Sequence, residues 1–401
     1  MKPSGIEWIG DIPDDWEVRR GKYTLDLLMR PIRDNDEIIT CFRDGQVTRR
    51  SNRREDGFTF ADKEIGYQGI LKGDLVIHGM DGFAGAIGIS DSDGKGSPVL
   101  NVCRPKNGSD TRYINYYLRT LALQNVFIAL STGIRERSCD LRWKKIAELL
   151  FTIPPLKTQQ KIADYLDEKC GEIDATISKQ KESIEKLKAY KQSLISETVT
   201  KGLDKSAPLK PSGIKWLGEI PQNARIIRLR FLSSIQTGDK DTANRVENGK
   251  YPFYVRSPIV ERIDTFSFDG EAILMAGDGV GAGKVFHYVN GKFDYHQRVY
   301  NIHNLKGVLG KFLYYYLREN FYKEIEQSNA KSTVDSIRLP MLLDFPIIVY
   351  PYDLQKEIVS FLDKKVAEID AIIIKKQNII QKLDAYKKSL IFECVTGKHK
   401  I

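Results

Sequence analysis

The glycine-rich segment 277–284 and the five histidines are the first places to look for phosphate or metal chemistry. A P-loop has a glycine five residues before its second glycine, and Ser or Thr after its lysine. Asp278 and Val285 stand at those positions relative to Gly283 and Lys284, so this pattern fails. The segment is predicted to be a structural turn between strands, with a backbone contact to phosphate as the alternative. The histidines show no metal-ligand spacing, and no metal site is predicted.

Catalytic motifs are missing as well. An adenine methyltransferase carries Asn or Asp, two prolines and an aromatic ring, which together hold a base flipped out of the duplex. The segment Ile153-Pro154-Pro155-Leu156 has the prolines but neither the amide nor the ring. Asp363 is followed by two lysines, as in some nuclease sites, but no carboxylate cluster lies beside it in the sequence. The chain is therefore predicted to have no active site of its own.

Basic residues provide the better signal. Arginines are dense between residues 43 and 54, where Gln, Ser and Asn stand among them; these residue types contact phosphates and base edges in DNA. A solvated surface loop is the alternative explanation for such a run. The candidate DNA-binding residues are Arg43, Arg49, Arg50, Arg53, Arg54, Arg135 and Arg137 in the first half of the chain, and Lys284, His296, Gln297, Arg298, Lys331 and Ser332 in the second.

The composition limits the class of protein. With 401 residues, 41% of them hydrophobic and 29% charged, the chain is expected to form two or three globular domains, which excludes a fibrous or wholly disordered protein. It has no long apolar run or signal peptide, and its five scattered cysteines fit a reduced, cytoplasmic protein without disulfides. The net charge of +9 makes an acidic partner plausible, but neither half is strongly basic, so binding would depend on local clusters.

An internal duplication organises the chain. The motif in residues 2–13 returns in residues 210–221, 208 positions later, and residues 155–200 return in residues 351–396, 196 positions later. A period near 200 residues is too long for a solenoid, so this is a duplicated domain. The predicted order is a first domain in residues 1–152, a helix in 153–205, a second domain in 206–348 and a second helix in 349–401.

The two repeated closing segments are predicted to be long helices. Apolar residues recur every three or four positions over about four heptads, which is the pattern of a coiled-coil seam. Some 40 residues would form a rod of roughly 60 Å. A coiled coil between two chains is one possible use of such a seam, but two equal seams in one chain favour an antiparallel pair within it. The seam positions are Leu166, Cys170, Ile173, Ile177, Ile184, Leu187 and Leu194, and Leu362, Val366, Ile369, Ile373, Ile380, Leu383 and Leu390.

The two intervening domains are predicted to be mixed α/β, so the fold class is α+β. Residues 71–77 and 272–275 are typical of strands that lead into glycine-rich turns, and residues 113–118 and 312–317 are typical of helices. The domains share this scaffold but differ in most of the sequence that would form their surfaces. This divergence suits two related tasks with two different targets.

Taken together, this layout resembles the DNA-specificity subunit of type I restriction–modification enzymes over essentially the whole chain. The opening motif P-S-G-I-x-W-[IL]-G-x-I-P stands at Pro3 and at Pro211. The family motif I-P-P-L-x-x-Q-x-x-I precedes the first helix at residues 153–162. The second copy departs from that motif but keeps Pro351, Gln355 and Ile358.

The resemblance implies a noncatalytic DNA-binding subunit located in the cytoplasm. Each recognition domain would read one half of a bipartite DNA site, and the paired helices would set the spacer and dock methyltransferase subunits, two per chain. Those subunits would bind S-adenosylmethionine, and restriction subunits that use ATP and Mg²⁺ would join the complex. The alternative function is an intracellular coiled-coil scaffold with two ligand-binding domains and no DNA role. A fused methyltransferase is disfavoured because no catalytic domain fits in the length.

Overall fold

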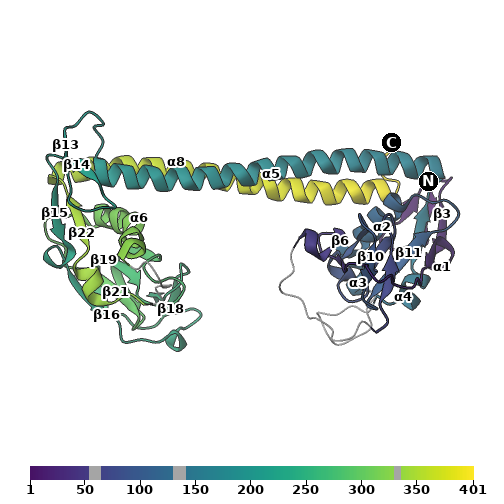
Figure 1. Cartoon of the computed structure of the whole chain (residues 1–401), viewed down its shortest axis with the longest axis horizontal. Coiled ribbons are helices and arrows are strands. Elements are labelled where there is room, and N and C mark those ends of the chain that lie inside the picture. The colour runs from purple at the N-terminus through teal and green to yellow at the C-terminus, as the bar shows by residue number, and fades with distance from the viewer. Residues whose placement is uncertain (54–64, 130–140, 329–335) are drawn as a thin grey trace. The chain divides into compact units, whose positions relative to one another are not determined.

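The chain forms two compact units in the computed structural model, which describes residues 1–53, 65–129, 141–328 and 336–401. One unit comprises Met1–Gln180 and Gln377–Ile401, and the other comprises Lys181–Lys376. Two long helices, α5 (Leu156–Lys201) and α8 (Tyr352–Val395), contribute a part to each unit (Figure 1). The predicted α+β class and both long helices are confirmed, whereas the domain boundaries at 152, 205 and 348 stay a prediction.

The first recognition domain is built on an antiparallel sheet. Its strands are β1 (Lys2–Pro3), β2 (Asp11–Ile12), β3 (Glu17–Arg20), β4 (Leu25–Leu27), β5 (Ile39–Cys41), β6 (Val47–Arg49), β7 (Gln68–Ile70), β8 (Leu75–His78), β9 (Ile87–Ile89), β10 (Gly94–Gly96), β11 (Leu100–Pro105) and β12 (Leu150–Ile153). Its helices are α1 (Gly21–Thr24), α2 (Thr111–Leu123), α3 (Val126–Ala129), α4 (Trp143–Glu148) and the 3₁₀ turns η1 (Arg50–Asn52) and η2 (Gly82–Ala84). The main sheet has the order β4-β11-β8-β9, and α2 packs against β9 and β11. The hairpin β5–β6 and the pairs β1–β2, β3–β12 and β7–β10 complete the domain.

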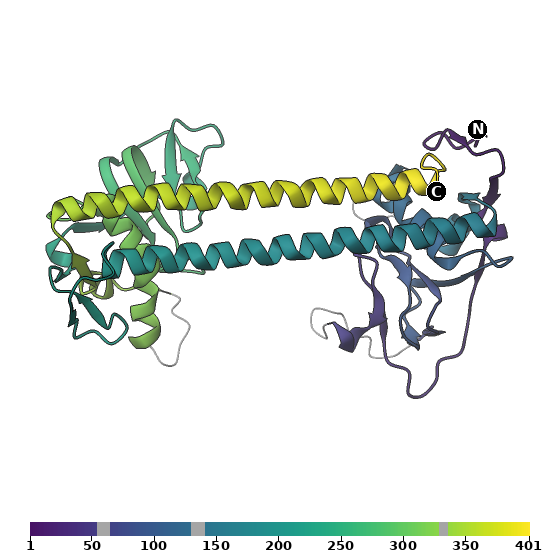
Figure 2. The same ribbon diagram turned by 90° about the horizontal axis from the view of Figure 1, so that it is seen from above.

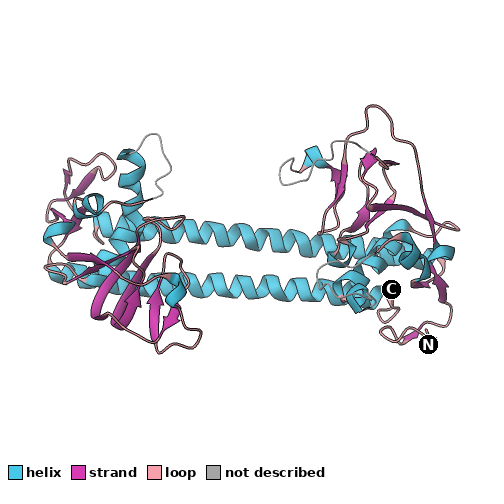
Figure 3. Cartoon of the chain, turned by 90° about the horizontal axis from the view of Figure 1, so that it is seen from below, coloured by secondary structure: helices cyan, strands magenta, loops and turns pink. Residues whose placement is uncertain are grey.

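The second recognition domain has a larger sheet, in the order β16-β21-β19-β20-β17-β18, which Figure 3 draws in magenta. Its strands are β13 (Leu209–Pro211), β14 (Glu219–Pro221), β15 (Arg225–Arg228), β16 (Ser234–Thr237), β17 (Tyr251–Tyr254), β18 (Glu261–Ile263), β19 (Phe268–Ala276), β20 (Phe286–Tyr295), β21 (Val299–His303) and β22 (Pro346–Val349). Its helices are α6 (Gly310–Ser328), α7 (Leu339–Leu343), η3 (Leu229–Phe231) and η4 (Thr242–Asn244). Helix α6 packs against β19 and β20, as α2 packs in the first domain. The strands and helices predicted around residues 75, 115, 273 and 315 are confirmed.

Helices α5 and α8 run antiparallel within each unit, and Figure 2 shows both along their length. In the first unit, Asp174 contacts Lys387, and the Tyr165 ring stacks on that of His399 with centroids 5.4 Å apart. In the second unit, Lys191 contacts Asp370. The predicted seam residues are buried or half-buried in the structure. The heptad pattern therefore identified the packing face correctly.

A lysine on each seam, Lys387 of α8 and Lys191 of α5, forms an ion pair with the other long helix. Lys387 Nζ lies 2.6 Å from Asp174 Oδ2, and Lys191 Nζ lies 2.6 Å from Asp370 Oδ1. The two pairs are copies of each other, because each residue of one pair stands 196 positions from its counterpart in the other. Polar residues on a coiled-coil seam favour the register in which they find partners, so these ion pairs help to specify the antiparallel alignment.

Truncating Lys387 to Ala is expected to lower the free energy of unfolding of the first unit by about 0.5–1 kcal/mol, as for other partly exposed ion pairs. The double mutant with Asp174→Ala should cost less than the sum of the two single changes. Urea denaturation of the four proteins measures this coupling energy, and Lys388→Ala, at the exposed next position, is the matched control. Strictly additive costs would contradict the assigned register.

The repeated opening motif folds into the same turn in both units. The backbone N–H of Ile6 donates to Ser4 Oγ at 3.1 Å, and that of Ile214 donates to Ser212 Oγ at the same distance. The glycine after each serine has φ of +71° and +74°. Glycine adopts this left-handed conformation without the steric cost of a Cβ. The serine and glycine of the motif are therefore explained by the turn itself.

The apolar residues of the motif attach each recognition domain to the C-terminal end of a long helix. Ile6, Ile9 and Ile12 are buried in the first core together with Ile391 and Val395 of α8. In the second core, Leu217 and Ile220 pack with Ile195 and Val199 of α5. The motif is repeated because this junction is repeated.

A buried glutamine near the start of each long helix makes a second repeated junction. Gln159 Oε1 accepts from the backbone N–H of Asp110 at 2.9 Å, and Gln159 Nε2 donates to the carbonyl of Pro154 at 2.8 Å. Gln355 accepts from the N–H of Leu309 at 2.8 Å and donates to the carbonyl of Tyr350 at 2.8 Å. Only a side chain with both a donor and an acceptor can make the two bonds. This explains why glutamine persists where the second copy of the motif otherwise diverges.

Candidate nucleic-acid interface

The arginine run of the first domain lies on the β5–β6 hairpin and on η1, which follows it. Three of its members face carboxylates. The ion pairs are Arg43 with Asp81 at 2.7 Å, Arg49 with Glu37 at 2.9 Å and Arg53 with Asp44 at 2.7 Å. Because acidic residues match these charges locally, the run is not a bare positive patch. Its guanidinium groups are instead oriented by their partners.

Three of these arginines line a hollow of about 560 Å³ in the first domain. Arg43, Arg50 and Arg53 contribute to its wall together with Tyr67 and His78. The Arg53 guanidinium also lies 4.2 Å from the centroid of the Phe42 ring. Guanidinium donors beside aromatic rings suit planar, hydrogen-bonding ligands such as nucleobases.

Two titratable groups beside the hollow have perturbed pKa values. Burial raises the pKa of Asp44, but hydrogen bonds from Arg53 and from the Gln46 N–H outweigh it, so the pKa of this carboxyl lies below its ordinary value. Burial lowers the pKa of His78, whose Nδ1 accepts a hydrogen bond from the Asp81 N–H at 2.9 Å. At neutral pH the hollow therefore contains a charged Asp44 and a neutral His78.

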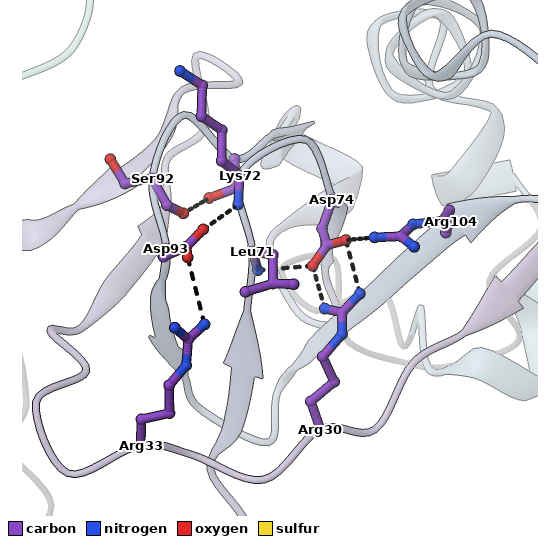
Figure 4. Close-up of polar contacts among 9 residues, drawn as sticks. Arg30, Arg33, Leu71, Lys72, Asp74, Ser92, Asp93 and Arg104 are labelled. Atoms are coloured by element: carbon purple, nitrogen blue, oxygen red, sulfur yellow. Dashed lines mark hydrogen bonds and ion pairs between the residues drawn. The ribbon is translucent and has the colours of Figure 1, made fainter.

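The segment that leads into the arginine hairpin is fixed by a buried aspartate (Figure 4). Asp74 is fully buried and accepts hydrogen bonds from Arg30, from Arg104 at 3.3 Å and from the Leu71 N–H at 2.8 Å. A buried carboxylate requires such partners. Because Arg30 precedes β5 in the chain, this ion pair ties the segment before the hairpin to the main sheet.

A second carboxylate in Figure 4 restrains the same segment. Asp93 accepts from the N–H of Lys72 at 2.8 Å and from Arg33 at 3.4 Å. The backbone hydrogen bond from Lys72 is the main cause that lowers the pKa of Asp93, and Arg33 lowers it further. Arg30 and Arg33 therefore have positioning roles that their place in the sequence did not reveal.

In the second domain, two arginines share one carboxylate in the glycine-rich turn between β19 and β20. Arg256 Nη1 lies 3.1 Å from Asp278 Oδ1, and Arg298 Nε lies 3.7 Å from Asp278 Oδ2. Gln297 donates to Asp241 at 3.3 Å. Arg298 and Gln297 were expected at the interface, whereas Arg256 was missed. No sequence signal could have found Arg256, because it stands alone between Val255 and Ser257.

The other candidates of the second domain are placed differently. His296 is only 2% exposed, and its Nδ1 accepts from the N–H of Arg298 at 2.9 Å. Burial and nearby Arg256 lower the pKa of His296, so its ring is neutral at pH 7. Lys284 lies over the Tyr322 ring, 4.3 Å from its centroid, and lines a separate hollow of about 710 Å³ with Lys188 and other residues. Arg298 does not line this hollow.

Five candidates lie outside the described residues, namely Arg54, Arg135, Arg137, Lys331 and Ser332. Among the residues that the structure does describe, no group of three or more His, Cys, Asp or Glu side chains could hold a metal ion. In the same part of the chain, no helix has the length and hydropathy needed to span a membrane.

A protein-family model of the type I restriction modification DNA specificity domain matches the chain twice, at residues 51–188 and 222–384. The two matches fall on the two halves of the duplication. The first match runs from η1 to residue 188 in α5, and the second runs from the residue after β14 to residue 384 in α8. Together they cover well over half of the chain.

Individual proteins resemble the chain at 14–29% sequence identity. The type I restriction enzyme EcoDI specificity subunit of Escherichia coli is 29% identical over 182 residues, which are 45% of this chain and 40% of that protein. The type I restriction enzyme MjaVIII specificity subunit of Methanocaldococcus jannaschii is 26% identical over 283 residues, which are 64% of each chain. The matches thus span 40% and 64% of these curated relatives. A solved chain from a study of assembly and conformational transition in the type I R-M system has a TM-score of 0.75 at 14% identity; the match covers 97% of this chain and 100% of that one, and shows a shared fold.

Proposed function

The chain belongs to the type I restriction modification DNA specificity family, and from this premise we propose that it is the noncatalytic DNA-binding subunit of a type I restriction–modification complex. The observation that carries the proposal is the double match of the family model, one match on each half of the duplication. Each half also presents arginines that are oriented by a carboxylate. Two such domains in one chain suit a target sequence that consists of two half-sites.

The division of labour within the complex follows from the duplicated structure. We propose that each recognition domain reads one half-site and that α5 and α8, which are continuous from one unit into the other, set the spacer between the half-sites. The helix–domain junction occurs twice in the chain, and we propose that each copy docks one methyltransferase subunit, which gives two per chain. Those subunits would bind S-adenosylmethionine and flip an adenine out of the stack, because its amine cannot be reached in the duplex. Restriction subunits that use ATP and Mg²⁺ would join this complex in the cytoplasm.

The candidate contact residues divide into two groups within this proposal. Arg43, Arg50 and Arg53 line the hollow of the first domain, and Gln297 and Arg298 stand at the exposed turn of the second. The buried His296 would hold the backbone of Arg298 through its hydrogen bond to the Arg298 N–H rather than contact DNA. The scaffold function without DNA is disfavoured, because the family model matches both recognition domains.

Co-expression with a cognate methyltransferase should produce one bipartite methylated motif in the host genome, and methylome sequencing detects it. Native mass spectrometry of the purified complex should give two methyltransferase subunits per chain. The assembled complex should bind a duplex with that motif roughly 10³-fold or more tightly than an unrelated duplex. Equal affinity for both duplexes, together with a methylome without any motif, would overturn the proposed function.

A further inference from the structure

The glycine-rich turns of the two domains are held by the same hydrogen bonds. In each turn, the backbone N–H of the first glycine donates to the carbonyl of the residue before the neighbouring strand. The carbonyl of the same glycine accepts from the N–H of a residue near the end of the domain. The four bonds are Gly79 N to Val99 O at 2.8 Å, Leu141 N to Gly79 O at 2.8 Å, Gly277 N to Arg298 O at 2.8 Å and Ile337 N to Gly277 O at 2.7 Å. The turns after β8 and β19 therefore occupy equivalent positions in the two domains and are fixed by equivalent backbone hydrogen bonds.

In each domain, an arginine-bearing hairpin packs closely against the glycine-rich turn. A Cβ on Gly85 would lie 2.6 Å from the carbonyl oxygen of Arg43, and a Cβ on Gly281 would lie 2.5 Å from that of Arg256. Such distances exclude any side chain at the two glycines without movement of the backbone. Arg43 follows β5 and Arg256 follows β17, and each of these strands forms a hairpin with the next strand in the chain. Arg43 and Arg256 thus occupy the same structural position.

Each of these arginines forms an ion pair with an aspartate of its turn. Asp81 holds Arg43 at 2.7 Å, and Asp278 holds Arg256 at 3.1 Å. A guanidinium group has five N–H donors in a planar fork. A single carboxylate contact uses part of the fork, orients its plane and leaves other donors available to a ligand. The arginine side chains remain 68% and 44% exposed, so a ligand can reach them.

The residues around this arginine–aspartate pair differ between the two domains. The residue before the neighbouring strand is Val99 in the first domain and Arg298 in the second, where its side chain also reaches Asp278. The tip of the second turn is Val280, which is fully exposed. An exposed apolar side chain beside two guanidinium groups matches the thymine methyl group and the purine edges of the DNA major groove. A shared arginine–aspartate pair with different neighbouring residues is expected for two domains that recognise different DNA sequences.

We propose that Arg43 and Arg256 are the base-reading residues of the two domains, each directed at O6 and N7 of a guanine in its half-site, with Asp81 and Asp278 as positioning residues. Arg298 and Val280 extend the reading surface of the second domain to neighbouring base pairs. The assignment rests on the proposed function. It adds which residues read bases and which base they read.

The experiment measures binding of the assembled methyltransferase complex to its cognate duplex and to duplexes with single-base substitutions. Arg43→Ala should weaken cognate binding roughly 10- to 100-fold and abolish discrimination at one guanine of the first half-site. Arg256→Ala should do the same at one guanine of the second half-site only. Arg43→Lys keeps the charge but not the fork, and should lose the discrimination as well. Arg20→Ala is the matched control, since Arg20 is a 55% exposed arginine of the first domain paired with Glu148 at 2.9 Å.

Asp278→Asn provides a second test, because it removes one negative charge and with it the ion pairs to both arginines. Discrimination in the second half-site should fall although binding to unrelated DNA is unchanged or stronger. Uniform weakening of Arg43→Ala on all duplexes, or wild-type discrimination by Arg43→Lys, would overturn the assignment and leave the proposed function intact. Failure of the wild-type complex to prefer its cognate duplex would overturn both. Melting curves of the variants, expected to match that of Arg20→Ala, separate these outcomes from misfolding.

Discussion

Exchange of residues 14–153 for the matching segment of a relative with a different target is expected to replace one half of the methylated sequence completely. The segment carries β3 and β12 together, because these strands form one antiparallel ladder from Glu17 with Ile153 to Arg20 with Leu150. It leaves the opening motif, both long helices and the second recognition domain unchanged. Discrimination at the original half-site should then be lost and a new half-site acquired.

The expectation follows from the two separate cores. The buried residues of the first domain pack among themselves and with parts of α5 and α8, and those of the second domain do the same in their own cluster. Base contacts made by one domain are therefore independent of the side chains of the other, and independent contacts contribute additively to binding. The spacer should keep its length, since neither helix is altered.

Methylome sequencing of a host with the hybrid chain measures the half-sites and the spacer together. The reciprocal exchange of residues 222–349, which keeps β15 with β22, is the matched control and should change the other half alone. A change in both half-sites after a single exchange would contradict the assignment of one half-site to each domain. A changed spacer would contradict the role of the helices.

Replacement of Gln159 by Leu is expected to lower the free energy of unfolding of the first unit by about 2–4 kcal/mol. The change leaves the backbone N–H of Asp110 and the carbonyl of Pro154 without their partner, and each unsatisfied buried group costs roughly 1–3 kcal/mol. Asp110 is also the N-cap of α2, whose side chain accepts from the N–H groups of Arg112 and Tyr113. The loss therefore loosens the start of α2 as well as the junction with α5.

Thermal denaturation should show a fall of roughly 5–15 °C in the melting temperature of the Gln159→Leu unit. Gln355→Leu should produce a similar fall in the second unit, because Gln355 makes the equivalent bonds to Leu309 and Tyr350. Gln160→Leu is the matched control, since Gln160 is exposed and adjacent in the same helix. A melting temperature of Gln159→Leu equal to that of Gln160→Leu would mean that the glutamine is dispensable for the junction.

Much of the fold could be predicted because its signals are local or periodic. The seam residues of α5 and α8 recur at heptad spacing, and that spacing alone places them on one face of a helix. The strand β8 and the helix α2 could be predicted in the same way, as could their counterparts in the second domain. The duplication added the expectation that whatever holds for one half holds for the other.

The candidate site was harder to predict. The density of arginines between residues 43 and 54 pointed to the β5–β6 hairpin, and Arg298 was found beside Gln297. Arg256 escaped notice because a lone arginine in a sequence has no signal. His296 was a candidate DNA contact because it stands beside Gln297 and Arg298, yet the fold buries it.

The sequence by itself determined the architecture of this protein: a twofold repeat, two long amphipathic helices and two diverged recognition domains of the type I DNA-specificity family. The tertiary structure alone decided which arginines are presented and how. Asp81 reaches Arg43 across 38 positions of sequence, and Asp278 gathers Arg256 and Arg298 from both sides. Periodic patterns are visible in one dimension because a helix or strand repeats them along the chain. An ion pair between distant loops exists only once folding has brought the loops together.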